Sequence, residues 1–221
     1  MALKKKSERM LEILGLAPVV PVLVIEDVSV ARPLAQALVE GGLPVIEVTM
    51  RTPDALKAIE EIRKHVEGAV VGAGTVVSAA MARDCVDVGC EFLVSPGTTA
   101  SLLKVAAKVD IPTLPGIVTP SEAMALAEEG FEVVKFFPAE AAGGVDYLRA
   151  LASPLPHITF CPTGGIGAAQ AADYLALPNV AAVGGSWVAP RVAIANGDWD
   201  RIRDLSAQAA ALGQSMGTAH A

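Results

Sequence analysis

Lys135 is the residue whose sequence surroundings point most directly to chemistry. It is the last lysine of the chain, and it lies inside the apolar run FEVVKFFP of residues 131–138. A lysine is rarely fully buried unless it is paired or functional, and burial penalises its cationic form. A neutral amine in an apolar pocket is the nucleophile that forms a Schiff base with a ketone. The run also allows a structural alternative, in which the stem packs at a strand end and the ammonium reaches water.

Glu47 and Arg51 are the next candidates, because both lie in or directly after the run VIEVTM of residues 45–50. A carboxylate that points inward from a strand is costly without a partner. Glu47 can therefore act as general acid and base for a substrate held by Lys135. Alternatively, it pairs structurally with Arg51 or points between strand and helix. Arg51 can hold a carboxylate in its bidentate fork, or lie on the surface at the start of a helix.

Two glycine-rich turns close the last two apolar runs. Residues 163–165 (TGG) end the seventh run, and residues 184–186 (GGS) end the eighth. Glycines leave backbone N–H groups free to face a phosphate. The loops after strands seven and eight of a parallel barrel frequently form such a site. Two ordinary tight turns are the alternative interpretation.

These residues follow eight short runs rich in β-branched side chains, each about one βα unit from the next. Amphipathic stretches between the runs predict helices. One begins at Pro53, with Thr52 as N-cap, and its apolar stripe runs from Leu56 to Val66. Another begins with a capping box at Thr119 and Glu122. The runs begin near Val19, Val45, Ala69, Phe92, Ile111, Glu132, Ile158 and Val180.

Eight such units predict an α/β fold of the (β/α)8 TIM-barrel type, in which functional side chains gather at the carboxyl ends of the strands. We expect residues 1–221 to form a single domain. Residues 1–18 are expected to hold an extra N-terminal helix, over residues 3–14, that covers the barrel bottom. Residues 213–221 are expected to be a frayed tail. A doubly wound open sheet is the alternative, although no GxGxxG motif follows the first run to bind a dinucleotide.

Composition restricts the classes of function. The net charge of −7 argues against nucleic-acid binding. No apolar stretch reaches the ~18 residues that a membrane span requires, and Glu8 and Glu12 interrupt any signal-peptide core. Cys85, Cys90 and Cys161 form no CxxC pair, which is typical of reduced cysteines in a cytoplasmic protein. The sequence contains no Cys/His cluster with metal-ligand spacing, so we expect no dedicated metal site.

Residues 19–190 resemble the 2-keto-3-deoxy-6-phosphogluconate and 4-hydroxy-2-oxoglutarate aldolases. These are class I enzymes on a (β/α)8 barrel, so the resemblance implies Schiff-base chemistry without metal or organic cofactor. It also implies a homotrimer. The matching segments, in order, are PVIEVTMRTP (44–53), GAGTV (72–76), FLVSPG (92–97), PGIVTP (115–120), VKFFPAE (134–140), PTGGI (162–166) and VGGSW (183–187).

The resemblance assigns a role to each candidate. It implies that Lys135 forms the Schiff base with a phosphorylated keto acid and that Glu47 is the general acid and base. Arg51 and Thr75 would hold the pyruvyl carboxylate. The residues that line the pocket beside the imine would be Pro96 and Phe137, and those at the phosphate end would be Thr163, Gly164, Gly165, Gly185 and Ser186.

Three other functions compete with cleavage of the phosphogluconate-derived acid to pyruvate and glyceraldehyde 3-phosphate. The same lysine can serve a different aldol, such as 4-hydroxy-2-oxoglutarate or the galactonate-derived epimer. A barrel that has lost catalysis can persist as a phosphosugar-binding module, although Lys135, Glu47 and Arg51 together argue against this. A pyridoxal phosphate enzyme also uses a lysine and phosphate-binding turns, and its purified solution would be yellow.

Overall fold

Short parallel strands occupy all eight predicted apolar runs. The computed structural model describes residues 2–213, so the predicted frayed tail lies outside the described residues except for Gly213. Pro115 divides the fifth run into two short strands, because proline has no N–H group for the ladder. The strands are β1 Val19–Leu23, β2 Val45–Thr49, β3 Val70–Gly74, β4 Leu93–Val94, β5 Thr113–Leu114, β6 Gly116–Ile117, β7 Val133–Phe136, β8 Thr159–Pro162 and β9 Val183–Gly185.

The strands pair in parallel with their neighbours in the sequence, except that the last strand, β9, pairs with the first, β1. One sheet has the order β5-β4-β3-β2-β1-β9, and a second has the order β6-β7-β8. Two isolated parallel bridges, Phe160–Val180 and Thr163–Gly184, connect β8 with the segment that leads into and includes β9. This consecutive order differs from a doubly wound sheet, in which the strand order reverses.

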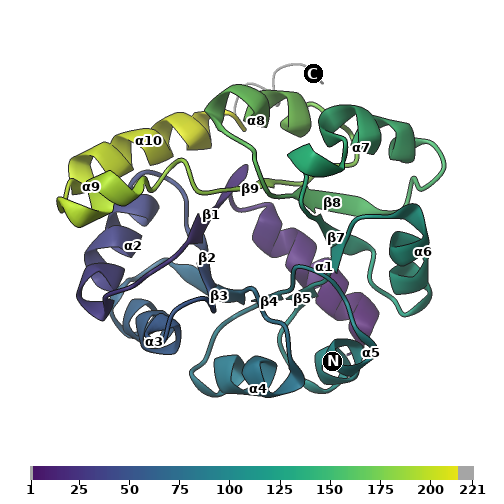
Figure 1. Ribbon diagram of the computed structural model, residues 1–221, viewed down its shortest axis with the longest axis horizontal. Helices are drawn as coiled ribbons and strands as arrows, with labels where there is room; N and C mark the ends of the chain where they lie inside the picture. The colour runs from purple at the N-terminus through teal and green to yellow at the C-terminus, as the bar shows by residue number, and fades with distance from the viewer. Residues whose placement is uncertain (1, 214–221) are drawn as a thin grey trace.

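Apart from α1, which precedes the first strand, the helices follow strands and lie around their outside (Figure 1). Their apolar stripes face the sheets: Ala58, Ile59 and Ile62 of α3, for example, are fully buried. The helices are α1 Leu3–Leu14, α2 Ala31–Glu40, α3 Ala55–His65, α4 Ala79–Asp87, α5 Ala100–Lys108, α6 Pro120–Glu128, α7 Gly144–Ala152, α8 Ala168–Leu175, α9 Arg191–Ala195 and α10 Trp199–Ala211, with 3-10 turns η1 Val28–Val30 and η2 Glu140–Ala142.

The predicted helix starts were right for α6 and wrong for α3. Thr119 and Glu122 form the expected capping box, with Pro120 in the first turn. By contrast, α3 begins at Ala55, and Asp54 occupies its N-cap position. The Thr52 hydroxyl instead donates a hydrogen bond to the Ile25 carbonyl oxygen after β1. A tertiary contact that the local sequence does not encode therefore outweighs the local capping preference.

Helix α1 lies where the sequence predicted an extra helix, and it contacts β5 and β7. Met10, Ile13 and Leu14 pack into an apolar cluster with side chains from several strands, including Val20 of β1 and Val94 of β4. Figure 1 shows the helix passing behind the middle of the strands. Among residues 2–213, no helix is both long and apolar enough to cross a membrane.

Two polar residues of α1 are also buried, and both have partners. The ammonium of Lys6 donates to the carbonyl oxygens of Ala106, Ala107 and Val109 at the end of α5. The Ser7 hydroxyl oxygen accepts from the backbone N–H groups of Glu132 and Val133 at the start of β7. Hydrogen bonds therefore join α1 to the strand that carries Lys135.

Candidate active site

Lys135 is buried, and its partner is Glu47. Only 5% of Lys135 and 3% of Glu47 is exposed, so the lysine does not reach bulk water as the structural alternative required. Its Nζ lies 3.2 Å and 3.5 Å from the two carboxylate oxygens of Glu47. Among the described residues, Glu47 therefore pairs with the lysine on β7 and not with Arg51.

Glycines on the neighbouring strands leave room for this pair. A Cβ atom on Gly74 of β3 would lie 2.0 Å from Oε1 of Glu47, so any larger residue would displace the carboxylate. Gly116 of β6 pairs in register with Lys135, and a Cβ there would lie 2.4 Å from the carbonyl carbon of Pro96. Pro96 is thus placed against the strand beside the lysine.

The surroundings of the Lys135 ammonium are largely apolar. The ring centroid of Phe137 lies 5.6 Å from Nζ, within the range of a cation–π contact. Cys161 of β8 pairs in register with Lys135, and burial raises the pKa of its thiol to about 12. A neutral thiol is a small apolar neighbour, so Glu47 supplies the negative charge that faces the lysine.

Arg51 and Thr75 form a second polar contact. The Nε–H group of Arg51 donates to the Thr75 hydroxyl oxygen at 3.0 Å. Thr75 has a φ of 57°, a left-handed conformation that is strained for a β-branched residue. In this conformation Thr75, directly after β3, places its hydroxyl group against the Arg51 guanidinium. An anion can thus meet both donors at one place.

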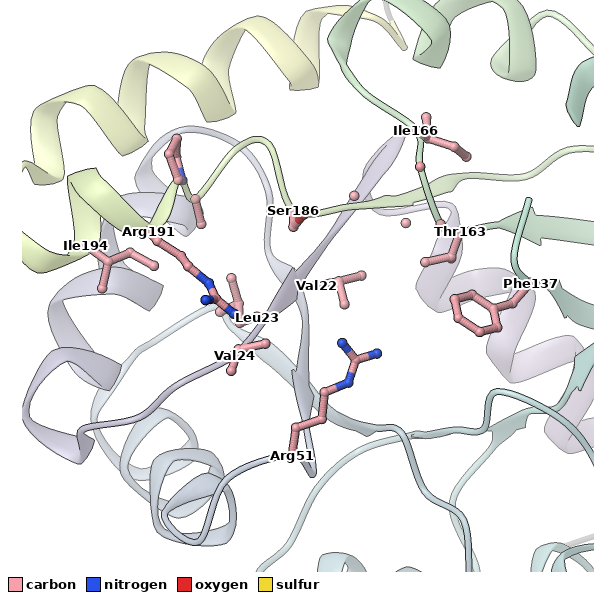
Figure 2. A pocket seen from close by; sticks show the side chains of 16 residues that line it. Val22, Leu23, Val24, Arg51, Phe137, Thr163, Ile166, Ser186, Arg191 and Ile194 are labelled. Atoms are coloured by element: carbon pink, nitrogen blue, oxygen red, sulfur yellow. The ribbon is translucent and has the colours of Figure 1, made fainter. Parts of the chain in front are cut away.

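A cavity of about 480 Å³ opens at the carboxyl ends of β1, β2, β7, β8 and β9 (Figure 2). Seven predicted site residues line it: Arg51, Phe137, Thr163, Gly164, Gly165, Gly185 and Ser186. Lys135, Glu47, Thr75 and Pro96 are not on this lining. Phe137 connects the two groups, because it lines the cavity and also lies against the Lys135 ammonium.

The two glycine-rich turns approach each other closely. Gly164 and Gly165 have φ angles of 108° and 82°, which favour glycine. A Cβ on Gly184 would lie 2.3 Å from the Thr163 hydroxyl oxygen. The N–H group of Glu140 donates to the Gly164 carbonyl oxygen at 3.0 Å, which ties this turn to the segment after Lys135.

The sequence analysis missed part of the lining. Ile166 and Ile194 supply apolar contacts, and Arg191 supplies a second guanidinium to the cavity lining in addition to that of Arg51. Arg191 follows Pro190 in a stretch without a recognisable motif, so no sequence signal marked it. Among the described residues, no group of three or more His, Cys, Asp or Glu side chains is placed to bind a metal ion.

A family model described as "KDPG and KHG aldolase" matches residues 10–205. The chain belongs to this aldolase family. The KHG/KDPG aldolase of Escherichia coli strain K12 is 49% identical over 197 residues, which cover 89% of this chain and 92% of the relative. The resemblance inferred from the seven sequence segments is therefore confirmed.

Solved structures of aldolases have the same fold. The Legionella pneumophila KDPG aldolase, described with pyruvate captured at low pH as a covalent carbinolamine intermediate, superposes with a TM-score of 0.89 at 44% identity. The match covers 90% of this chain and 97% of that one. The Zymomonas mobilis aldolase with 3-phosphoglycerate gives a TM-score of 0.87 at 46% identity, and covers 95% of this chain and 97% of that one.

Proposed function

We propose that this protein is a class I aldolase that reversibly cleaves 2-keto-3-deoxy-6-phosphogluconate to pyruvate and glyceraldehyde 3-phosphate. The observation that carries the proposal is the buried pair of Lys135 and Glu47 beside the cavity. A nucleophilic amine next to a proton carrier is the arrangement that Schiff-base formation needs. Membership of the aldolase family supports the same activity.

Imine formation begins with a proton transfer inside the pair. Glu47 takes a proton from the Lys135 ammonium, and the neutral amine attacks the C2 ketone to give a carbinolamine. Glu47, acting through water, then returns the proton to the departing hydroxyl group. Water leaves, and the product is an iminium between Nζ and C2. The iminium accepts electrons in the next step, so the amine itself activates the substrate.

Carbon–carbon cleavage uses the same carboxylate. Glu47 removes the proton from the C4 hydroxyl, the C3–C4 bond breaks, and its electrons move onto the iminium. Glyceraldehyde 3-phosphate departs and an enamine remains on Lys135. Glu47 then protonates C3, and water hydrolyses the new iminium to pyruvate and free lysine. Each proton that Glu47 accepts is returned, so the cycle closes without a cofactor.

The remaining candidates bind the two ends of the substrate. We assign the pyruvyl carboxylate to Arg51 and Thr75, which already contact each other. Pro96 and Phe137 would flank the imine. The phosphate would lie at the turns after β8 and β9, where the backbone and hydroxyl donors belong to Thr163, Gly164, Gly165, Gly185 and Ser186.

We further propose that the two sheets form one closed (β/α)8 barrel over a single domain of residues 1–221. The two bridges between β8 and the β9 segment, and the single residue between β5 and β6, support closure. Within the capping segment of residues 1–18, α1 would close the barrel bottom, since its apolar face packs among side chains of the strands. The family resemblance also implies a homotrimer, and we assign the protein to the cytoplasm because its three cysteines are free.

Pyruvate release, coupled to lactate dehydrogenase, tests the proposed activity. We expect the phosphorylated acid to be cleaved with a higher kcat/KM than its unphosphorylated analogue or 4-hydroxy-2-oxoglutarate. Both C4 epimers belong in the panel, because the turns do not determine stereochemistry at C4. Failure of every keto acid to release pyruvate would contradict the proposal. Light scattering of the purified protein measures its oligomeric state separately.

A further inference from the structure

The charges of the proposed substrate exceed those of the residues assigned to bind it. A phosphate monoester carries about −1.5 to −2 charges near pH 7, and the keto acid adds a carboxylate. Arg51 is assigned to the carboxylate, and Lys135 forms the imine. The turns at Thr163 and Ser186 offer hydroxyl and backbone N–H donors without a positive charge. The phosphate end therefore lacks a counter-ion in the proposed function.

Arg191 lies where such a counter-ion is needed. It is the first residue of α9, just after the turn that contains Ser186, and it lines the cavity. Figure 2 shows its side chain reaching from α9 towards Leu23 and Val24. Arg51 enters the cavity from another side, after the end of β2. Within residues 2–213, no protein group forms a hydrogen bond or ion pair with its guanidinium.

The cavity favours an anion at this position. No aspartate or glutamate of the described chain lines it, so the two arginines are not neutralised by their surroundings. A guanidinium can donate two parallel hydrogen bonds to a phosphate, which makes arginine better suited than lysine to a planar, bidentate contact. Its free donors are thus available to a ligand and need not break an existing ion pair.

We propose that Arg191 is a specificity-determining residue that binds the terminal phosphate of the substrate together with the β8 and β9 turns. This inference rests on the proposed function, because it concerns the far end of the same substrate. Arg191 would favour keto acids that end in a phosphate over those that end in a hydroxyl group. It would leave imine formation with pyruvate unaffected, because pyruvate has no group that reaches α9.

Steady-state kinetics of Arg191→Ala and Arg191→Lys test the assignment. Arg83→Ala is the matched control, since Arg83 is an exposed arginine on α4 outside the cavity lining. Loss of one charge-assisted contact should lower kcat/KM for the phosphorylated acid about tenfold to a hundredfold, mainly through KM. Arg191→Lys keeps the charge, so its loss of kcat/KM should be smaller than that of Arg191→Ala. For the unphosphorylated acid, kcat/KM should change less than about twofold in either variant.

Binding of inorganic phosphate provides a second measurement that does not require turnover. Phosphate should raise the melting temperature of the wild-type protein and of Arg83→Ala, and this shift should shrink in Arg191→Ala. Equal losses for phosphorylated and unphosphorylated substrates, or an unchanged phosphate shift, would overturn the role of Arg191. Wild-type protein that releases no pyruvate would instead refute the proposed function, so the two failures are distinguishable.

Discussion

Glu47 is the residue on which proton transfer depends, because its carboxylate lies within 3.2 Å of the Lys135 Nζ where solvent barely enters. Two charges in such a site are costly to bury, and replacing a buried ion pair by apolar residues of similar volume is often neutral or stabilising. The pair is therefore better explained by chemistry than by stability. Its geometry suits a proton that moves back and forth during each turnover.

The variant Glu47→Gln separates these contributions. Glutamine keeps the shape of the side chain but cannot carry the proton, so we expect kcat to fall about 10²–10⁴-fold. Steady-state assays should show this loss while circular dichroism stays native. Glu67→Gln, on the exposed surface, is the control and should keep full activity. A kcat equal to that of the wild type would remove Glu47 from its assigned role.

The three cysteines predict a dependence of stability on alkaline pH. Burial raises the pKa of Cys85, Cys90 and Cys161 to about 12, whereas a thiol in the unfolded chain ionises near pH 9. Between these values the folded state retains protons that the unfolded state loses. The stabilisation is complete below about pH 9 and is lost as the pH rises towards about 12.

Urea unfolding at about pH 8 and about pH 10 measures this effect. For each buried thiol, the free energy of unfolding should fall by up to about 1.4 kcal/mol per pH unit in this window. Cys161→Ala should therefore show a smaller decrease between the two pH values than the wild type. The same decrease in both proteins would contradict the assignment of the raised pKa to Cys161.

At this scale the sequence identified Lys135 because a lone lysine in an apolar strand is unusual. It left the partner of Glu47 open between the site of Lys135 and Arg51, since Lys135 and Glu47 are 88 positions apart and only the fold brings them together. Arg191 was missed for a different reason. Surface arginines are common, and only the cavity distinguishes this one from Arg83 or Arg201.

Secondary-structure elements were predictable where their signal is local. The alternation of apolar runs and amphipathic stripes located all eight strand regions, although not the division of the fifth at Pro115, and the Thr119 capping box predicted the start of α6. The start of α3 was not predictable, because the Thr52 hydroxyl bonds to Ile25, 27 residues earlier in the chain. The turn that carries Gly164 likewise depends on a bond from Glu140.

The capping box on α6 provides a test at the scale of one helix. The Thr119 hydroxyl oxygen accepts from the Glu122 backbone N–H group, which otherwise has no partner in the first turn. Thr119→Ala should lower the free energy of unfolding by about 1 kcal/mol, and Thr119→Ser should preserve it. Urea titration of both variants measures the difference. A destabilised serine variant would show that the methyl group, rather than the cap, matters.

At the scale of the whole molecule, α1 joins the N-terminal residues to the strands that position the lysine. The sequence predicted this helix, but not the burial of Lys6, because it is the third of three consecutive lysines. Burial lowers the pKa of Lys6, and the Asp110 carboxylate acts in the opposite direction. Its three carbonyl partners at the end of α5 explain why a lysine is tolerated there.

Neighbouring residues of α1 offer a matched pair of variants. Met10 is fully buried against the strands, whereas Leu11 is 43% exposed. Met10→Ala should cost about 2–5 kcal/mol of stability, and Leu11→Ala should change it by less than about 0.5 kcal/mol. Thermal and urea unfolding measure both. Similar losses for the two variants would mean that α1 does not pack on the strands as described.

Borohydride reduction in the presence of pyruvate tests the central chemical claim most directly. The reduced adduct is stable, so peptide mass spectrometry can locate it. We expect one pyruvate-derived label per chain, on Lys135, and none in Lys135→Ala, whereas removal of the exposed Lys104 should leave labelling intact. A label on any other lysine, or no label on active wild-type enzyme, would contradict the assignment of Lys135 as the Schiff-base residue.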